Sequence, residues 1–233
     1  MTAVNIIRSP GCVHLITDGL MKIPEEMLNR LPPGTEGEHP LVAKAFPIPH
    51  LNLAFVVRGL PPHIAMLALA IPALAHSYDE VKDLFVEGIR SVWTSTAPLW
   101  EQQHGKGSDM ADIFVAGISE TTGPDSYAVV THNRYRDTRA WQRRDLGPIS
   151  MAPLDQAVFD KVAASLTAGE SIEDVARAMI GAQRMQDVTM ADGRALAGED
   201  TIGGFVQVTS VRRDEITTRI VERYPAPRIR IAS

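Results

Sequence analysis

The sequence has a single cysteine, few aromatic residues and no long uninterrupted apolar run. Cys12 has no partner within the chain, so no internal disulfide can form, which fits a reducing compartment. The most apolar stretch, 64–75, falls short of the roughly 20 residues that a membrane-spanning helix needs, and Pro72 interrupts it. The first residues lack the basic and apolar regions of a secretory signal. We therefore expect a soluble, cytoplasmic protein without membrane contact.

Several classes of ligand also lack a matching pattern. The net charge of -5 argues against a nucleic-acid partner, because neutralising phosphates requires clustered Lys and Arg. The seven histidines form no metal-binding spacing, and no phosphate-binding loop or dinucleotide fingerprint is present. Ser119 lacks the second glycine of an esterase nucleophile elbow. We expect neither a metal nor a cofactor.

What the sequence does contain is a regular order of short strands and paired helices. Apolar periodicity and turn residues predict strands over 4–8, 12–17, 43–48, 51–58, 112–119, 126–132, 202–211 and 215–224. The same criteria predict helices over 61–75, 78–93, 154–166 and 172–185. This order is typical of two antiparallel sheets packed face to face with helices outside, an α+β, four-layer αββα sandwich. We expect one domain over 1–233, with loop excursions near 24–40, 97–111 and 133–150.

The N-terminus offers a candidate for chemistry. Removal of Met1 would leave Thr2 with a free α-amino group, whose pKa near 8 lets it accept a proton around neutral pH. Such an amine can activate the hydroxyl of its own residue for attack on a carbonyl. Thr2 also leads directly into the first predicted strand, so a rigid element would position it.

At this point the chain resembles a known family. Thr2-Ala3-Val4, Gly11 and Thr17-Asp18-Gly19 match without a gap the opening of proteasome β subunits and of the bacterial proteasome-like protease HslV. Lys44 and Gly59 stand where that family has a lysine in the next strand and a glycine at the end of the following one. The resemblance implies the fold of N-terminal nucleophile (Ntn) hydrolases and a threonine peptidase or amidohydrolase activity.

The resemblance also implies a role for each matching residue. Thr2 would be the nucleophile, Lys44 an ammonium that stabilises negative charge beside it, and Asp18 the partner that orients Lys44. The backbone N–H of Gly59 would donate to the oxyanion of the tetrahedral intermediate. Ser150, which the resemblance places among the catalytic residues, loosely matches the serine of a glycine-serine-glycine segment that the family carries before its third helix.

Further expectations concern the substrate and the assembly. In this register Met21, Val42, Phe46 and Val56 are predicted to line a pocket for a peptide or amide substrate. The family also suggests a ring of identical copies and an ATP-driven unfoldase as partner. Two alternatives stay open, since Leu60 replaces the second glycine of a Gly-Gly pair: a catalytically silent protein that keeps the fold for assembly or binding, and a hydrolase of small amides.

Overall fold

The chain starts with a tight hairpin that turns on a glycine. The computed structural model describes residues 2–21, 28, 32, 36–133, 135, 138–189, 195–225 and 228–230. In it, β1 (Val4–Ser9) pairs antiparallel with β2 (Cys12–Asp18). Gly11 at the turn has a φ of 72°, a left-handed conformation that glycine adopts without strain. All seven residues of β2 are buried, so both of its faces are covered.

Two five-stranded antiparallel sheets are found among the described residues. The first has the order β13-β12-β2-β1-β9, with β9 at Ile149–Ala152, β12 at Phe205–Val211 and β13 at Ile216–Arg223. The second has the order β4-β5-β6-β7-β8, with the bounds Ala45–Ile48, Leu53–Arg58, Asp112–Ser119, Gly123–Val130 and Arg144–Asp145. A short 3-10 turn, Pro49–Leu51, connects β4 to β5.

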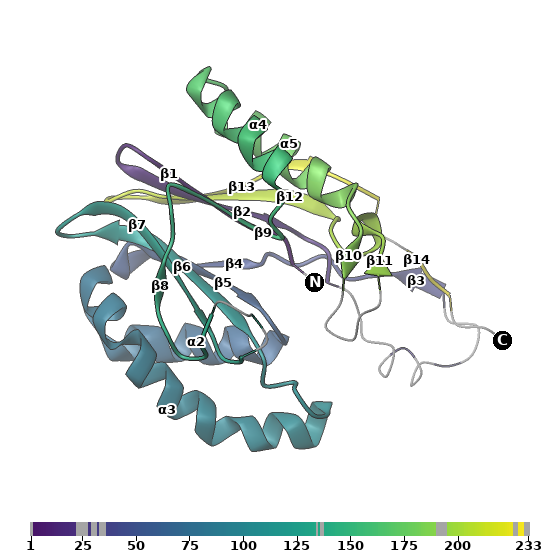
Figure 1. Ribbon diagram of the computed structural model, residues 1–233. Coiled ribbons are helices and arrows are strands. Elements are labelled where there is room, and N and C mark those ends of the chain that lie inside the picture. The colour runs from purple at the N-terminus through teal and green to yellow at the C-terminus, as the bar shows by residue number, and fades with distance from the viewer. Residues whose placement is uncertain are drawn as a thin grey trace.

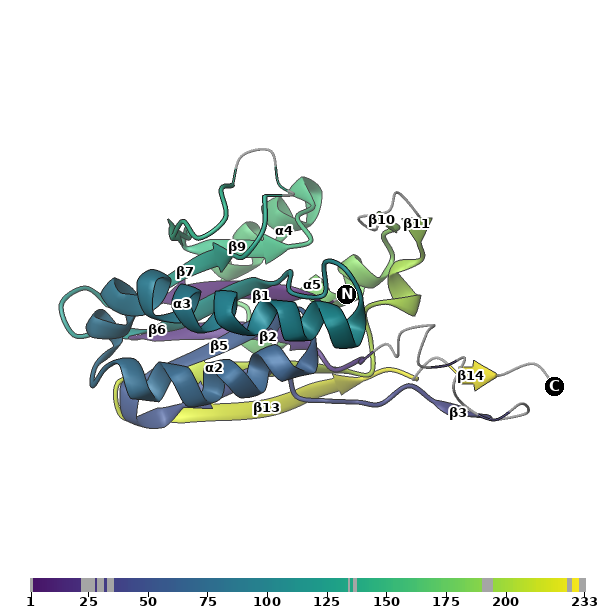
Figure 2. The ribbon, with the colours of Figure 1, turned by 90° about the horizontal axis from the view of Figure 1, so that it is seen from below.

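Each sheet carries a pair of helices on its outer face (Figure 1). The bounds of these helices are Pro61–Leu74 for α2, Tyr78–His104 for α3, Gln156–Thr167 for α4 and Ile172–Arg184 for α5. Ser77 caps α3 by accepting the Glu80 N–H, as the capping pattern predicts. Figure 2 shows α2 and α3 lying side by side across the second sheet.

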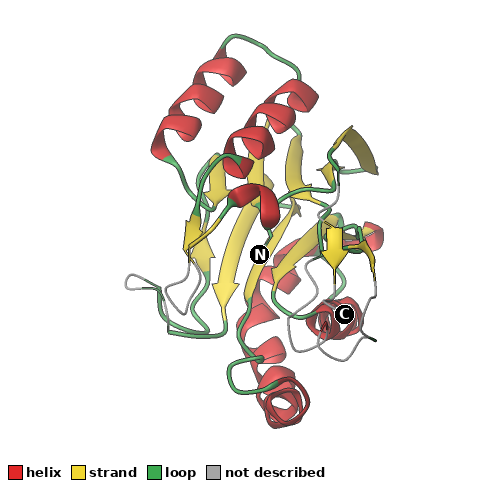
Figure 3. Cartoon of the chain, turned by 90° about the vertical axis from the view of Figure 1, so that its right-hand side faces the viewer, coloured by secondary structure: helices red, strands yellow, loops and turns green. Residues whose placement is uncertain are grey.

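Three apolar cores join these elements into four layers. One core lies between α2–α3 and the second sheet, one between the two sheets, and one between the first sheet and α4–α5. The expected αββα sandwich of two antiparallel sheets flanked by helices is confirmed. Figure 3 shows the N-terminal end between the two helical layers, and in Figure 1 it lies on the side from which β3 and β14 extend.

The expected loop over 97–111 is wrong in its first part. Helix α3 continues through this region to His104 and ends at Gly105, which has a φ of 91°. The helix continues because Trp100 buries its ring against Trp93, about two helical turns earlier, with ring centroids 5.0 Å apart. Only the segment after His104 is a loop.

The other two excursions contain short strands where the structure describes them. Strands β8 and β9 lie at the end of 133–150 and extend the two sheets. Within 24–40, most residues before 36 lie outside the described part, and β3 (Glu36–Glu38) pairs with β14 (Arg228–Arg230). A small hairpin, β10 (Val188–Thr189) with β11 (Ala195–Leu196), and a 3-10 turn at Gly198–Asp200 precede β12.

No single helix among the described residues is long and apolar enough to cross a membrane. Only α2 and α3 taken together have that length and composition, and a bend of 120° separates them.

Candidate active site

Asp18 is a fully buried carboxylate at the end of β2, and five hydrogen bonds converge on it. Its Oδ1 accepts from the backbone N–H of Ala3 at 2.9 Å and from Lys44 Nζ at 2.7 Å. Its Oδ2 accepts from Lys44 Nζ at 2.8 Å, from the Leu20 N–H at 3.1 Å and from the Gly203 N–H at 3.2 Å. A carboxylate with this many donors is held in one orientation, and its negative charge is well compensated.

Lys44 lies just before β4 and forms an ion pair with Asp18, as expected from its place in the sequence. Only 6% of the residue is exposed, so the ammonium has almost no access to water. Burial lowers the pKa of Lys44 below its usual value, the charge and hydrogen bonds of Asp18 raise it, and the charge of Arg58 lowers it again. The net result is a lowered pKa, which makes this ammonium a better proton donor than a surface lysine.

Thr2 is half-buried and directly precedes Ala3, whose backbone binds this ion pair. The peptide nitrogen that follows Thr2 belongs to Ala3, and it binds the same Asp18 oxygen as Lys44 Nζ. The ammonium nitrogen of Lys44 therefore lies within two hydrogen-bond lengths of the Ala3 backbone nitrogen, which follows Thr2. Because Ala3 is fully buried and leads into β1, the backbone of Thr2 is held in place by the sheet. The fold thus brings together Thr2, Asp18 and Lys44, residues far apart in the chain.

Gly59 follows the last residue of β5 and is packed too tightly to carry a side chain. A Cβ atom at this position would lie 2.6 Å from His63 Nδ1 and 3.0 Å from the Ala111 Cβ. The family resemblance implies that the backbone N–H of this glycine donates to the oxyanion, a role in which the backbone must approach the substrate closely. The structure adds a second reason, the contact with His63.

The structure does not bring Ser150 to Thr2. Ser150 lies in β9, where it is opposite Ile6 of β1. Thr2 precedes Ile6 by four residues, which is roughly 13 Å along an extended strand. This geometry therefore gives no support to the prediction that Ser150 is one of the catalytic residues.

Three of the four predicted pocket residues are open to solvent, and one is not. Met21 and Val42 are half-buried and flank the end of β2 through bonds to the backbone of Pro40 and Gly19. Phe46 is 40% exposed. Val56 is fully buried in the core between the two sheets, so the prediction that it lines a substrate pocket is wrong.

Sequence reasoning missed a polar network next to Lys44. Arg58 lies 3.4 Å from the Asp112 carboxylate, which also accepts the Tyr135 hydroxyl at 2.7 Å and lies 3.0 Å from His132 Nε2. Burial alone would raise the pKa of Asp112, but the His132 hydrogen bond, the Arg58 charge and the Tyr135 hydrogen bond together lower it. The backbone N–H of Gly203 was also missed as a donor to Asp18.

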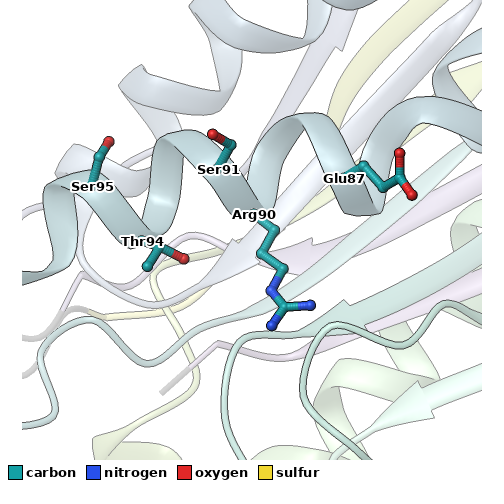
Figure 4. Close-up of a pocket in the computed structure, with 5 residues that line it drawn as sticks. All are labelled: Glu87, Arg90, Ser91, Thr94 and Ser95. Atoms are coloured by element: carbon teal, nitrogen blue, oxygen red, sulfur yellow. The ribbon is translucent and has the colours of Figure 1, made fainter.

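Two other kinds of site, a metal site and a surface hollow, have less support among the described residues than the cluster of Thr2, Asp18 and Lys44. No three His, Cys, Asp or Glu side chains in that part of the chain gather closely enough to hold a metal ion. A shallow hollow runs along α3, and Figure 4 shows that its lining comes from this one helix: Glu87, Arg90, Ser91, Thr94 and Ser95. None of these residues belongs to the Thr2 cluster.

Comparison with known proteins adds evidence on the fold. No protein-family model matches the chain, and no curated protein matches it. Among solved structures, Anbu (ancestral beta-subunit) from Yersinia bercovieri is similar, with a TM-score of 0.58 and 8% sequence identity over 94% of this chain and 87% of that one. A similarity at this level of identity shows a shared fold and gives no information on activity. The chain therefore has a proteasome-like fold of the Ntn type.

Proposed function

We propose that this chain is a threonine-type peptidase or amide hydrolase whose nucleophile is Thr2, exposed as the first residue by removal of Met1. One observation carries the proposal: a single buried carboxylate, Asp18, binds both the Lys44 ammonium and the backbone N–H next to Thr2. A buried ion pair costs desolvation energy, so its place beside a candidate nucleophile favours a chemical role over a purely structural one.

The reaction would proceed by acyl transfer. The Thr2 hydroxyl oxygen attacks the carbonyl carbon of the substrate while the α-amine of Thr2 takes the hydroxyl proton. The C–N bond of the substrate then breaks, and the leaving amine departs with that proton, which leaves an ester on Thr2. Water attacks the ester, the α-amine relays the proton of the water to the Thr2 oxygen, and the carboxylic acid is released.

The surrounding groups would stabilise charge in these steps. Lys44, still an ammonium through its contact with Asp18, lowers the cost of negative charge on the Thr2 oxygen. The Gly59 N–H would donate to the oxyanion of the tetrahedral intermediate. Met21, Val42 and Phe46 would contact the apolar side chain of the substrate; Ser150 and Val56 have no part in this scheme.

The assembly is a separate part of the proposal. A peptide substrate fits a homo-oligomeric ring with the Thr2 sites inside and an ATPase partner that unfolds substrates. A small amide would require neither, so the oligomeric state measured by light scattering separates these two versions. A single copy in solution would favour the small-amide hydrolase.

The test is intact mass with N-terminal sequencing, before and after treatment with a peptide epoxyketone, which captures the hydroxyl and free α-amine of an N-terminal threonine. We expect loss of Met1 and one adduct on Thr2. Thr2→Val keeps the branched shape and removes the hydroxyl, so it should give no adduct. Retained Met1, or a free Thr2 without an adduct, would refute the proposal and favour the catalytically silent alternative.

A further inference from the structure

His63 is a buried histidine that the scheme above does not use, and it lies directly behind the loop that carries Gly59. Its side chain is fully buried between two indole rings, with centroid distances of 4.4 Å to both Trp93 and Trp100. It comes from the first turn of α2, three residues after Leu60. Histidine in such surroundings needs a reason, because burial of a polar ring costs free energy unless its nitrogens bind partners.

The partner of the imidazole is the backbone of the loop. His63 Nδ1 accepts the Leu60 N–H at 3.2 Å, and the His63 N–H donates to the Leu60 carbonyl at 3.0 Å. Both polar backbone groups of Leu60 are therefore held by one residue. Pro61 and Pro62, which stand between Leu60 and His63, have no N–H. A side chain at the helix start therefore cannot accept their N–H groups, as it does in an ordinary N-cap; here a side chain inside the helix, His63, accepts the N–H of Leu60, the residue before the helix.

The same ring also restricts Gly59. The position of a Cβ on Gly59 would be 2.6 Å from His63 Nδ1, so the ring packs against the Gly59 Cα. Glycine has the largest backbone freedom of all residues, whereas an oxyanion donor is effective only when its direction is fixed in advance. A glycine in this role therefore requires a neighbour that removes its freedom, and His63 is in contact on the side where a Cβ would stand.

The hydrogen bonding also defines the proton position on the ring. Nδ1 accepts an N–H, so the proton of the neutral imidazole is on Nε2, which is buried and has no hydrogen-bond partner among the described residues. Burial lowers the pKa of His63 to about 4, with a smaller contribution from the charge of His104. The imidazole is thus neutral around pH 7, the form in which Nδ1 can accept.

We propose that His63 is a positioning residue for the oxyanion site, holding the Gly59–Leu60 backbone so that the Gly59 N–H keeps a fixed direction toward the substrate carbonyl. This inference rests on the proposed function. It assigns His63 an effect on the rate of the chemical step, and no direct contact with substrate.

The experiment compares two variants that differ in one acceptor atom. His63→Asn places an amide oxygen near the position of Nδ1, whereas His63→Gln places its amide near Nε2 and leaves Leu60 without an acceptor. The first readout is the hydrogen exchange of the Leu60 amide by NMR, which needs no activity. We expect protection close to wild type in His63→Asn and its loss in His63→Gln.

The second readout is epoxyketone inactivation of Thr2, analysed as the maximal rate and the half-saturating concentration. We expect the maximal rate to fall about 100-fold in His63→Gln, with an unchanged half-saturating concentration and substantial rescue in His63→Asn. Leu67→Ala is the matched control, because Leu67 is fully buried on the same helix and its truncation lowers stability without touching the loop. The control should keep the wild-type maximal rate.

The outcomes separate the two proposals. An unprotected Leu60 amide in the wild type, or equal maximal rates in His63→Gln and His63→Asn, would overturn the positioning role of His63. A wild-type protein that forms no Thr2 adduct would overturn the proposed function, whatever the exchange of Leu60 shows.

Discussion

The ion pair between Asp18 and Lys44 predicts unequal costs for removing its two partners. Asp18→Asn replaces a carboxylate, which only accepts hydrogen bonds, by an amide. The NH₂ group of that amide is itself a donor, and it would have to face other donors. Every arrangement of that amide points its NH₂ at backbone N–H groups or at the Lys44 ammonium, because both carboxylate oxygens of Asp18 accept at least two hydrogen bonds. Lys44→Met, in contrast, leaves Asp18 with three backbone N–H donors.

The magnitudes follow from these contacts. Breaking a buried ion pair by removing one partner costs about 3–5 kcal/mol. We expect Lys44→Met at the lower end, about 3 kcal/mol, because the remaining backbone donors still compensate the carboxylate. We expect Asp18→Asn at about 5 kcal/mol or more, because the buried ammonium then lacks an anionic acceptor and backbone N–H groups lose theirs.

The assay is urea unfolding at pH 7 of both single variants and of the double variant. The double variant should cost less than the sum of the single ones, because neither charge is then left unpaired. A cost below about 1 kcal/mol for Lys44→Met, or a larger cost for Lys44→Met than for Asp18→Asn, would refute the reasoning from burial and donor number.

Two further predictions concern pH and the substrate pocket. Burial lowers the pKa of His14 and of His63 to about 4, so the unfolded chain binds more protons between about pH 6.5 and pH 4. For each histidine, the free energy of unfolding should therefore fall by about 3 kcal/mol as the pH is lowered from about 6.5 to 4. Urea unfolding at several pH values checks this, because His14→Gln should show a weaker acid dependence than wild type. Phe46→Ala should change the ratio of kcat/KM between substrates with large and small apolar side chains. Phe46 is 40% exposed and contacts Phe55, so the loss of stability should be about 1–2 kcal/mol, below that of a fully buried phenylalanine; an unchanged ratio would contradict its place in the pocket.

Much of the fold could be predicted because local sequence specifies the ends of its elements. The strand expected at 112–119 has the same bounds in β6, and the hairpin at Gly11 turns where its glycine indicates. Ser77 and Ser171 cap α3 and α5 through the N–H three residues later. In each case the determining residues are close in sequence, so no tertiary information is needed.

The end of α3 could not be predicted because distant contacts determine it. The segment after Trp93 is polar, which indicates a loop when it is taken alone. Trp100 nevertheless packs against His63 of α2, and this contact buries one face of the segment while the others stay exposed. Tertiary packing of one face outweighs the weak local preference of the rest.

The candidate site also combines contacts that the sequence predicts with contacts that only the folded chain shows. The ion pair of Asp18 with Lys44 links the end of β2 in the first sheet to the residue before β4 in the second, and the family resemblance of the first 59 residues already implies it. The Gly203 N–H reaches Asp18 from 185 residues away, and the role of His63 depends on contacts with two indole rings of another helix. Neither has a local pattern, so both became visible only when the elements were assembled.

The failure of Val56 as a pocket residue follows from the alternation of side chains along β5. Phe46 lies opposite Phe55 across the β4–β5 pair, and their rings are in contact, so both point to the same face of the sheet. Side chains in a strand alternate between faces, and Val57 therefore shares this face with Phe55 whereas Val56 points into the core between the sheets. On that face Phe55 and Val57 are themselves buried in the core beneath α2 and α3, so of these four residues only Phe46 is open to a substrate.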